Sequence, residues 1–130
     1  MKSIMHGKDG RCYLCMKYDN NFSTHEVLQE HHVIYGTANR KLSEKYGLKV
    51  YLCVAHHLAS GCKDAVHRSK ATKEYLCKEA QKCFEEKYPN LSFLEIFGIN
   101  YLEDADREVI RQQAEFSFKH IDDGLEEMEW

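Results

Sequence analysis

The stretch Glu30-His31-His32-Val33-Ile34-Tyr35-Gly36 places two adjacent histidines at the head of an apolar, β-branched run. Such a run predicts a β-strand, which we expect within residues 27–35 and ending at Gly36. A strand alternates its side chains between two faces, so His31 and His32 should point in opposite directions. One strand can therefore offer two imidazoles for two different tasks.

A second histidine pair follows a second strand-like run. Residues 48–53 predict that strand, and Cys53-Val54-Ala55-His56-His57 directly continues from it. A helix should begin at about His56. Together with Cys12 and Cys15, we interpret the two pairs as parts of two metal sites that share one small scaffold.

The segments around these runs are more polar. A tight turn is expected at residues 12–15, a loop at residues 16–26, and at most a short helical turn at residues 41–46. Farther on, apolar residues at three- and four-residue steps predict a helix from Ser69 or Thr72 to about residue 88. A short helix should follow in residues 91–98, and an exposed one in residues 103–113.

The 130 residues have the length of one compact domain. We expect a flexible N-terminus over residues 1–11, a domain with its packing helices over residues 12–102, and an acidic, partly helical tail over residues 103–130. No apolar leader and no run of transmembrane length is present, which predicts a cytoplasmic protein without a membrane partner. In that compartment, clustered Cys and His are typical of metal ligands rather than of disulfides.

Charge is distributed unevenly along the chain. Residues 1–89 carry 15 Lys and Arg against 10 Asp and Glu, and residues 90–130 carry 3 against 11. A basic body with an acidic tail suits a nucleic-acid-binding protein whose tail limits non-specific contacts. A tail that only increases solubility explains the pattern equally well.

Four residues have the spacing of a structural zinc site. Cys12 and Cys15 supply two thiolates from one turn, and Cys53 and His56 repeat the spacing with an imidazole in last place. Cys62 is an alternative fourth ligand, and incidental or redox-active thiols at the first pair are the competing interpretation. Two further cysteines, Cys77 and Cys83, fall within the helical pattern and read as small core residues.

The remaining histidines suit hydrolysis of a phosphodiester. That reaction needs an activated water and a cation that stabilises the developing charge. Of His31 and His32, one would face the metal and the other the water, because a neutral imidazole can take a proton near pH 7. His57 would be a second metal ligand, and His67 a third ligand or a phosphate contact. No site is assigned to the other three histidines, at positions 6, 25 and 120.

The order Cys-x-x-Cys, His-His strand, Cys-x-x-His-His resembles the HNH endonuclease superfamily with the ββα-metal (His-Me finger) fold. It is most similar to the zinc-bearing phage subset, such as endonuclease VII-type resolvases and recombination-associated HNH nucleases. The resemblance covers about residues 12–67. It implies that His31 binds the catalytic metal, that His32 is the general base, and that His57 and His67 also serve the metal.

The chain departs from this family pattern at three places. His31 stands where Asp is commoner, His56 stands where a fourth Cys is commoner, and Asn39 is the nearest candidate for the middle Asn. A site rich in imidazole favours transition metals over Mg²⁺. The catalytic cation could therefore be Mg²⁺, Mn²⁺, Ni²⁺ or Zn²⁺, beside a structural Zn²⁺.

The resemblance implies an α+β fold with a small ββα-metal core, a structural zinc site and C-terminal helices. It also implies a metal-dependent DNA endonuclease of phage or prophage origin that acts in recombination or DNA processing in the host cytoplasm. A homodimer or a recombination protein would be compatible partners. Five basic residues are expected to meet phosphates, unless they form only a solvated face: Arg40, Lys41, Lys63, Arg68 and Lys70. The alternative is a non-catalytic zinc-binding adaptor for nucleic acid or protein.

Overall fold

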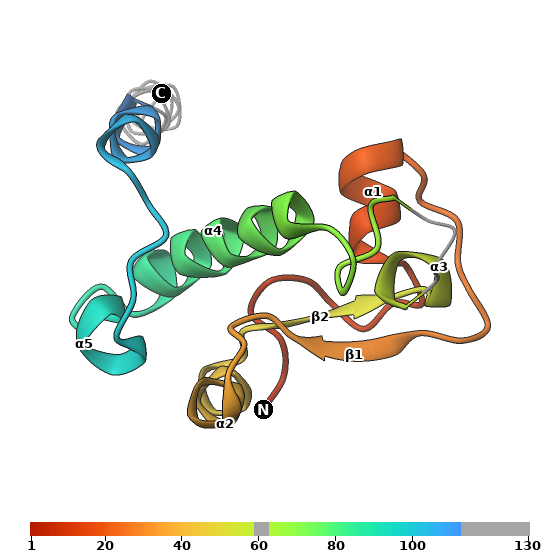
Figure 1. Ribbon diagram of the computed structural model, residues 1–130, viewed down its shortest axis with the longest axis horizontal. Coiled ribbons are helices and arrows are strands. Elements are labelled where there is room, and N and C mark those ends of the chain that lie inside the picture. Colours follow the sequence, from red (N-terminus) through yellow and green to blue (C-terminus); the bar gives the residue numbers. More distant parts are fainter. Residues whose placement is uncertain (59–62, 113–130) are drawn as a thin grey trace, which may run out of the picture.

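The computed structural model describes residues 1–58 and 63–112 and has a small mixed α/β fold. Its elements are, in order, α1 (Tyr13–Asp19), β1 (Gln29–His32), α2 (Thr37–Tyr46), β2 (Lys49–Leu52), α3 (Val54–His57), α4 (Lys70–Lys87) and α5 (Phe93–Phe97). Residues 104–112 are also helical. In Figure 1, α4 runs along the long axis between α5 and the end of the molecule that holds α1 and α3.

The two predicted strands are present, although both are shorter than expected, and they pair as an antiparallel hairpin. β1 pairs with β2 in the register Gln29↔Leu52, Glu30↔Tyr51, His31↔Val50 and His32↔Lys49. Residues 33 and 34 leave the strand but remain buried, since their apolar side chains pack in the core. The two histidines of β1 therefore lie at the end of the hairpin, where neighbouring elements can reach them.

The connection between the strands is a full helix rather than a short helical turn. α2 spans Thr37–Tyr46 and ends at Gly47, whose φ of +76° is the left-handed conformation that glycine adopts easily. Buried Ser43 anchors it, because its hydroxyl contacts both the backbone N–H and the carbonyl of Ile34, each at 3.2 Å. The full length of α2 therefore depends on its packing against the residues that follow β1, because the local sequence predicts this helix only weakly.

The N-terminal cysteine motif also differs from the turn and loop that we expected. Cys12 is the N-cap of α1, and its Sγ accepts a hydrogen bond from the Cys15 N–H at 3.5 Å. Burial of Tyr13 and Leu14 anchors the first turn of α1 in the core. The helix ends at Asn20, whose N–H donates to the Cys15 carbonyl. Both cysteines are thereby held on one helical turn.

The helices α4 and α5 match their prediction closely. Ser69 caps α4 by accepting from the Thr72 N–H, and Ser92 caps α5 in the same way through Glu95. Gly98 ends α5 in the left-handed conformation. Local signals suffice here because each helix has a side-chain cap and a clear stop.

The core lies between α4 and the hairpin and continues to α5, which packs against α2 and α4. α4 contributes Leu76, Ala80 and Phe84, which are 0–1% exposed. Phe84 is also the centre of an aromatic cluster with Tyr46 of α2 and Phe93 of α5. This cluster ties α2 to the C-terminal helices and so fixes the element that faces the end of β1.

The N-terminal segment, predicted to be flexible, contacts the end of α2 and the start of β2. The Ile4 N–H donates to the Gly47 carbonyl at 2.9 Å, and the Ser3 hydroxyl donates to the Lys49 carbonyl. Its predicted mobility stays a prediction. Of the acidic, partly helical tail expected over residues 103–130, residues 104–112 are helical, and the part beyond residue 112, like Cys62, lies outside the described residues. Among the helices that the structure describes, none has the length and apolar character needed to cross a bilayer.

Candidate metal centres and cleft

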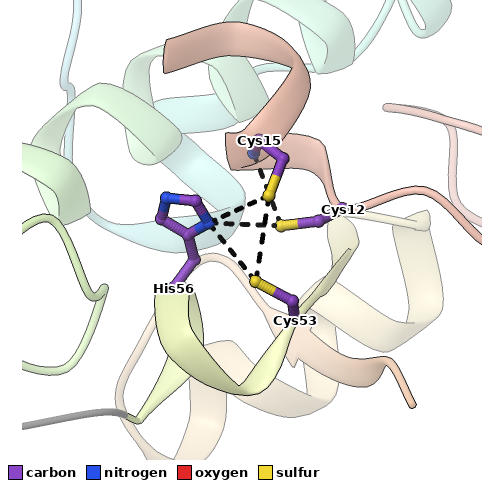
Figure 2. A group of neighbouring side chains, drawn as sticks. All are labelled: Cys12, Cys15, Cys53 and His56. Carbon is purple, nitrogen blue, oxygen red and sulfur yellow. Dashed lines mark hydrogen bonds between the residues drawn. The ribbon is translucent and has the colours of Figure 1, made fainter. Parts of the chain in front are cut away.

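The four residues predicted from their spacing converge on one point. Cys12 and Cys15 lie at the start of α1, and Cys53 and His56 lie at α3; Figure 2 shows their three sulfurs and one ring nitrogen facing a common centre. The His56 Nδ1 lies 3.6, 3.3 and 3.4 Å from the sulfurs of Cys12, Cys15 and Cys53, respectively. All four ligand atoms fall within 4.8 Å of one another.

These separations fit a tetrahedral metal ion. With metal–sulfur bonds of about 2.3 Å and metal–nitrogen bonds of about 2.05 Å, a tetrahedron has S–S edges of roughly 3.8 Å and S–N edges of roughly 3.6 Å. The Cys15 and Cys53 sulfurs are 3.9 Å apart. The cluster is also buried, with every member at most 7% exposed. A buried Cys₃His cluster that could hold a structural metal ion is therefore present.

Burial explains why this cluster suits a cation. Desolvation, followed by the neighbouring Cys12, raises the pKa of the Cys15 thiol, and desolvation also raises that of Cys53. Thiolates are the metal-binding form, and a divalent cation removes the penalty of burying several of them together. The donor set is thus suited to a bound ion and poorly suited to bare thiolates.

Two residues around this cluster were not assigned from sequence. The Asp19 carboxylate lies 3.5 Å from the Nε2 of His56, on the side of the ring opposite the sulfurs. Metal-ligating histidines commonly donate their second N–H to such a carboxylate. His25, for which no site was predicted, places its Nε2 3.6 Å from the Cys15 sulfur. Neither residue belongs to the Cys-x-x-Cys or the Cys-x-x-His motif, so only the fold shows that both lie beside the cluster.

A second cluster contains the three histidines proposed for a catalytic metal. The rings of His31, His57 and His67 have centroid separations of 4.7–5.3 Å. The Nε2 atoms of His57 and His67 are 3.0 Å apart. Two imidazole nitrogens on one ion, each about 2.05 Å from it, lie roughly 2.9–3.4 Å apart, so this distance fits shared coordination.

Gln29 orients one of these rings, and the sequence alone did not identify it. Its Oε1 lies 2.7 Å from the Nδ1 of His57 and, as an amide oxygen, accepts that N–H. The hydrogen bond leaves the Nε2 of His57 with its lone pair directed toward His67. Gln29 and His31 lie two residues apart on β1 and so on one face of it.

The surroundings of the histidine cluster favour uncharged imidazoles. Burial, and then the charges of His57 and His67, lowers the pKa of His31 to about 3. Burial and His67 likewise lower the pKa of His57, and burial and Lys73 lower that of His67. At neutral pH the three imidazoles are therefore uncharged, which is the form that binds metals.

His32 lies on the other side of the strand, as its alternation with His31 predicts. Its Nε2 is 2.7 Å from an Oε2 of Glu44 on α2 and 3.4 Å from Glu30. The Lys49 ammonium, directly across the hairpin from His32, lies 3.0 Å from the same Glu44 oxygen. His32 thus contacts an ionic group rather than the three-histidine cluster.

One cavity nevertheless joins both histidine environments. It has a volume of about 880 Å³, and its lining includes His31, His32, His57 and His67. Of the five basic residues expected to contact phosphates, Arg40 and Lys41 line it. Among the described residues of its wall, the other three, Lys63, Arg68 and Lys70, do not occur.

Comparison with known proteins adds no relationship. No protein-family model, no curated protein and no solved structure matches the chain. The features that bear on its chemistry are a buried Cys₃His cluster, a three-histidine cluster, and a cavity that connects the three-histidine cluster to His32.

Proposed function

We propose that the chain is a metal-dependent endonuclease of the HNH type that hydrolyses phosphodiester bonds in DNA. The observation that supports this most strongly is the single cavity in which His32 joins the three-histidine cluster and two cationic side chains. The pairing of β1 with β2, joined through α2 and followed by α3, with a Cys₃His cluster beside α3, is compatible with the ββα-metal arrangement that the sequence resembles.

The residues would divide the reaction between them. A divalent cation bound by His31, His57 and His67 would supply Lewis-acid stabilisation of charge on the phosphate. His32 accepts the proton of the attacking water, and Arg40 and Lys41 hold the phosphates of the bound strand. The Cys₃His cluster holds a structural Zn²⁺ that clamps α1 to the end of the hairpin.

The direct test is a cleavage assay of the zinc-loaded protein. Single-stranded, duplex and branched DNA, and RNA, are each incubated with Mg²⁺, Mn²⁺, Ni²⁺ or Zn²⁺ added separately. We expect cleavage of DNA with at least one of these ions and none after chelation. Nucleic-acid binding without cleavage under every condition would contradict the nuclease and support the zinc-binding adaptor.

A pair of lysine variants tests whether the cavity is where DNA binds. Lys41 lines the cavity, whereas Lys70 is 91% exposed on α4 and does not line it. Lys41→Ala should weaken DNA binding and lower the salt dependence by about one counterion, while Lys70→Ala serves as the matched control. Equal effects of the two substitutions would argue against the cavity as the binding site.

A further inference from the structure

His32 belongs to an ionic group that also contains Glu30, Glu44 and Lys49. The His32 Nε2 lies 2.7 Å from Glu44 and 3.4 Å from Glu30, and both partners are carboxylates. A carboxylate whose pKa is held low can only accept, so Nε2 must carry the proton and donate it. The other ring nitrogen, Nδ1, has no hydrogen-bond partner among the described residues.

Glu44 is held firmly in this position. It follows Ser43, whose buried hydroxyl fastens α2 to the backbone of Ile34. Its two carboxylate oxygens lie 3.2 and 3.0 Å from the Nζ of Lys49, a side chain that is only 6% exposed. The carboxylate is therefore fixed from α2 and from β2 at once, while His32 belongs to β1.

A metal ion is a poor explanation for this group. Glu30, His32 and Glu44 do have ligand atoms within 4.8 Å of one another. However, the Lys49 ammonium already lies 3.5 Å from Glu30 and 3.0 Å from Glu44, so a cation there would meet a buried positive charge at short range. The group is better suited to orienting an imidazole than to binding a second ion.

We propose that Glu44, braced by Lys49, is the positioning residue for His32, an inference that rests on the proposed nuclease function. Glu44 accepts the Nε2–H, which fixes the tautomer in which Nδ1 has the lone pair. The orienting carboxylate of a catalytic triad acts on its histidine in the same manner and stabilises the imidazolium that forms.

In the proposed reaction, Nδ1 of His32 receives one proton from the attacking water. The O–H bond of the attacking water breaks, its proton forms a bond to Nδ1 of His32, and the oxygen forms a bond to phosphorus. The bond from phosphorus to the leaving oxygen breaks, and that oxygen takes a proton from solvent. His32 returns its extra proton to solvent, while Nε2–H stays bonded to Glu44 throughout.

The experiment compares Glu44→Gln with the wild type and with Glu74→Gln, an exposed glutamate on α4. A glutamine can donate its amide to Nε2 and so favours the opposite tautomer. We expect kcat to fall by at least about 100-fold, with KM for DNA and metal affinity within about twofold of wild type. Glu74→Gln should cleave at the wild-type rate.

The tautomer provides a readout that does not depend on activity. Two-bond ¹H–¹⁵N correlation spectra of the metal-loaded wild type should show His32 as the Nε2–H tautomer, and those of Glu44→Gln should show a shift toward Nδ1–H. A wild-type His32 in the Nδ1–H form, or a kcat for Glu44→Gln within about twofold of wild type, would overturn the inference.

Two other outcomes also decide the matter. If Glu44→Gln loses metal and DNA affinity together with kcat, Glu44 is a structural residue and the inference is wrong. If the wild type does not cleave while His32 remains Nε2–H, the proposed function fails and the role in proton transfer falls with it, although the hydrogen bond stands. An active wild type with an unimpaired Glu44→Gln refutes the inference alone.

Discussion

At the scale of single residues, adjacent histidines on one strand are placed in different surroundings. His31 faces two other imidazoles, and burial with their charges lowers its pKa to about 3. His32, one residue later, meets Glu44 and lies across the hairpin from Lys49. The alternation of a β-strand is enough to separate a residue suited to bind metal from one suited to move a proton.

Glu44 should remain ionised well below the pH at which a glutamate ordinarily protonates. Hydrogen bonds from His32, Lys49 and the amino terminus lower its pKa from 4.5 to about 2. Since the folded value lies below the unfolded one, the carboxylate stabilises the fold above about pH 4.5 and loses that contribution as the pH falls toward 2. The ¹³C carboxyl shift followed against pH measures this directly.

The Lys49→Met variant is the comparison for that titration. It removes one hydrogen-bond donor and one positive charge from Glu44, so the midpoint should move upward from the wild-type value. A wild-type midpoint near 4.5, unchanged in the variant, would show that the ionic group does not form in solution.

A second residue-scale prediction concerns the cysteines. Cys12→Ser should leave the chain without bound zinc and without cooperative unfolding, because binding free energy at a structural site, on the order of 10 kcal/mol, becomes folding free energy. Cys83→Ser, which changes a partly buried cysteine outside the cluster, is the control and should keep both. Zinc content by elemental analysis and thermal melting decide between them; equal behaviour would refute a structural zinc site.

At the scale of elements, the N-terminal segment packs against the turn that ends α2. A methyl group added to Gly47 would lie 2.5 Å from the Lys2 carbonyl oxygen, and its φ is +76°. Gly98 ends α5 with nearly the same φ, +75°, but has open space around it. The two glycines thus differ in what surrounds them and hardly at all in conformation.

Gly47→Ala should therefore destabilise the protein more than Gly98→Ala. The left-handed conformation alone costs about 1–2 kcal/mol for a residue with a Cβ, and at Gly47 the clash with Lys2 adds to it. The free energy of unfolding in urea measures both variants. Equal losses would show that residues 1–5 do not pack on α2 in solution and would support the flexible N-terminus expected from the sequence.

Elements with strong local signals were predictable, and those that depend on packing were not. α4 and α5 each have a serine N-cap, and their bounds follow from it. α2 has no side-chain cap at Gly36, so only its contact with Ile34 and the aromatic cluster reveals its full length. The four residues of the Cys₃His cluster were predicted from their short spacing, whereas Gln29 and Glu44 pair with histidines 28 and 12 residues away and need the fold.

At the scale of the whole molecule, charge is separated along the chain. Residues 119–130 contain five acidic residues and one lysine, so a chain truncated after Phe118 would change from a net charge of −3 to +1. This truncation should change thermal stability little and should raise non-specific affinity for duplex DNA at low salt. Loss of folded protein on truncation would show instead that the removed segment packs on the body or on a partner subunit.

The whole arrangement places the Cys₃His cluster and the cavity at neighbouring positions around one hairpin. His56 belongs to the first and His57 to the second, so a single turn of helix, α3, serves both. An ion at the buried cluster would therefore also fix the direction of the neighbouring ligand. The Cys₃His cluster and the proposed catalytic site thus share the helix α3.

The central claim, a metal-dependent nuclease with His32 as its base, is tested most directly by cleavage rate against metal concentration for wild type, His57→Ala and His32→Ala, with DNA binding measured alongside. High metal concentration should partly restore His57→Ala, whereas His32→Ala should remain about 10²–10⁴-fold slower at every concentration. Imidazole added to the buffer should partly restore His32→Ala only. A His32→Ala variant that cuts at the wild-type rate, or recovers with metal alone, would contradict the account.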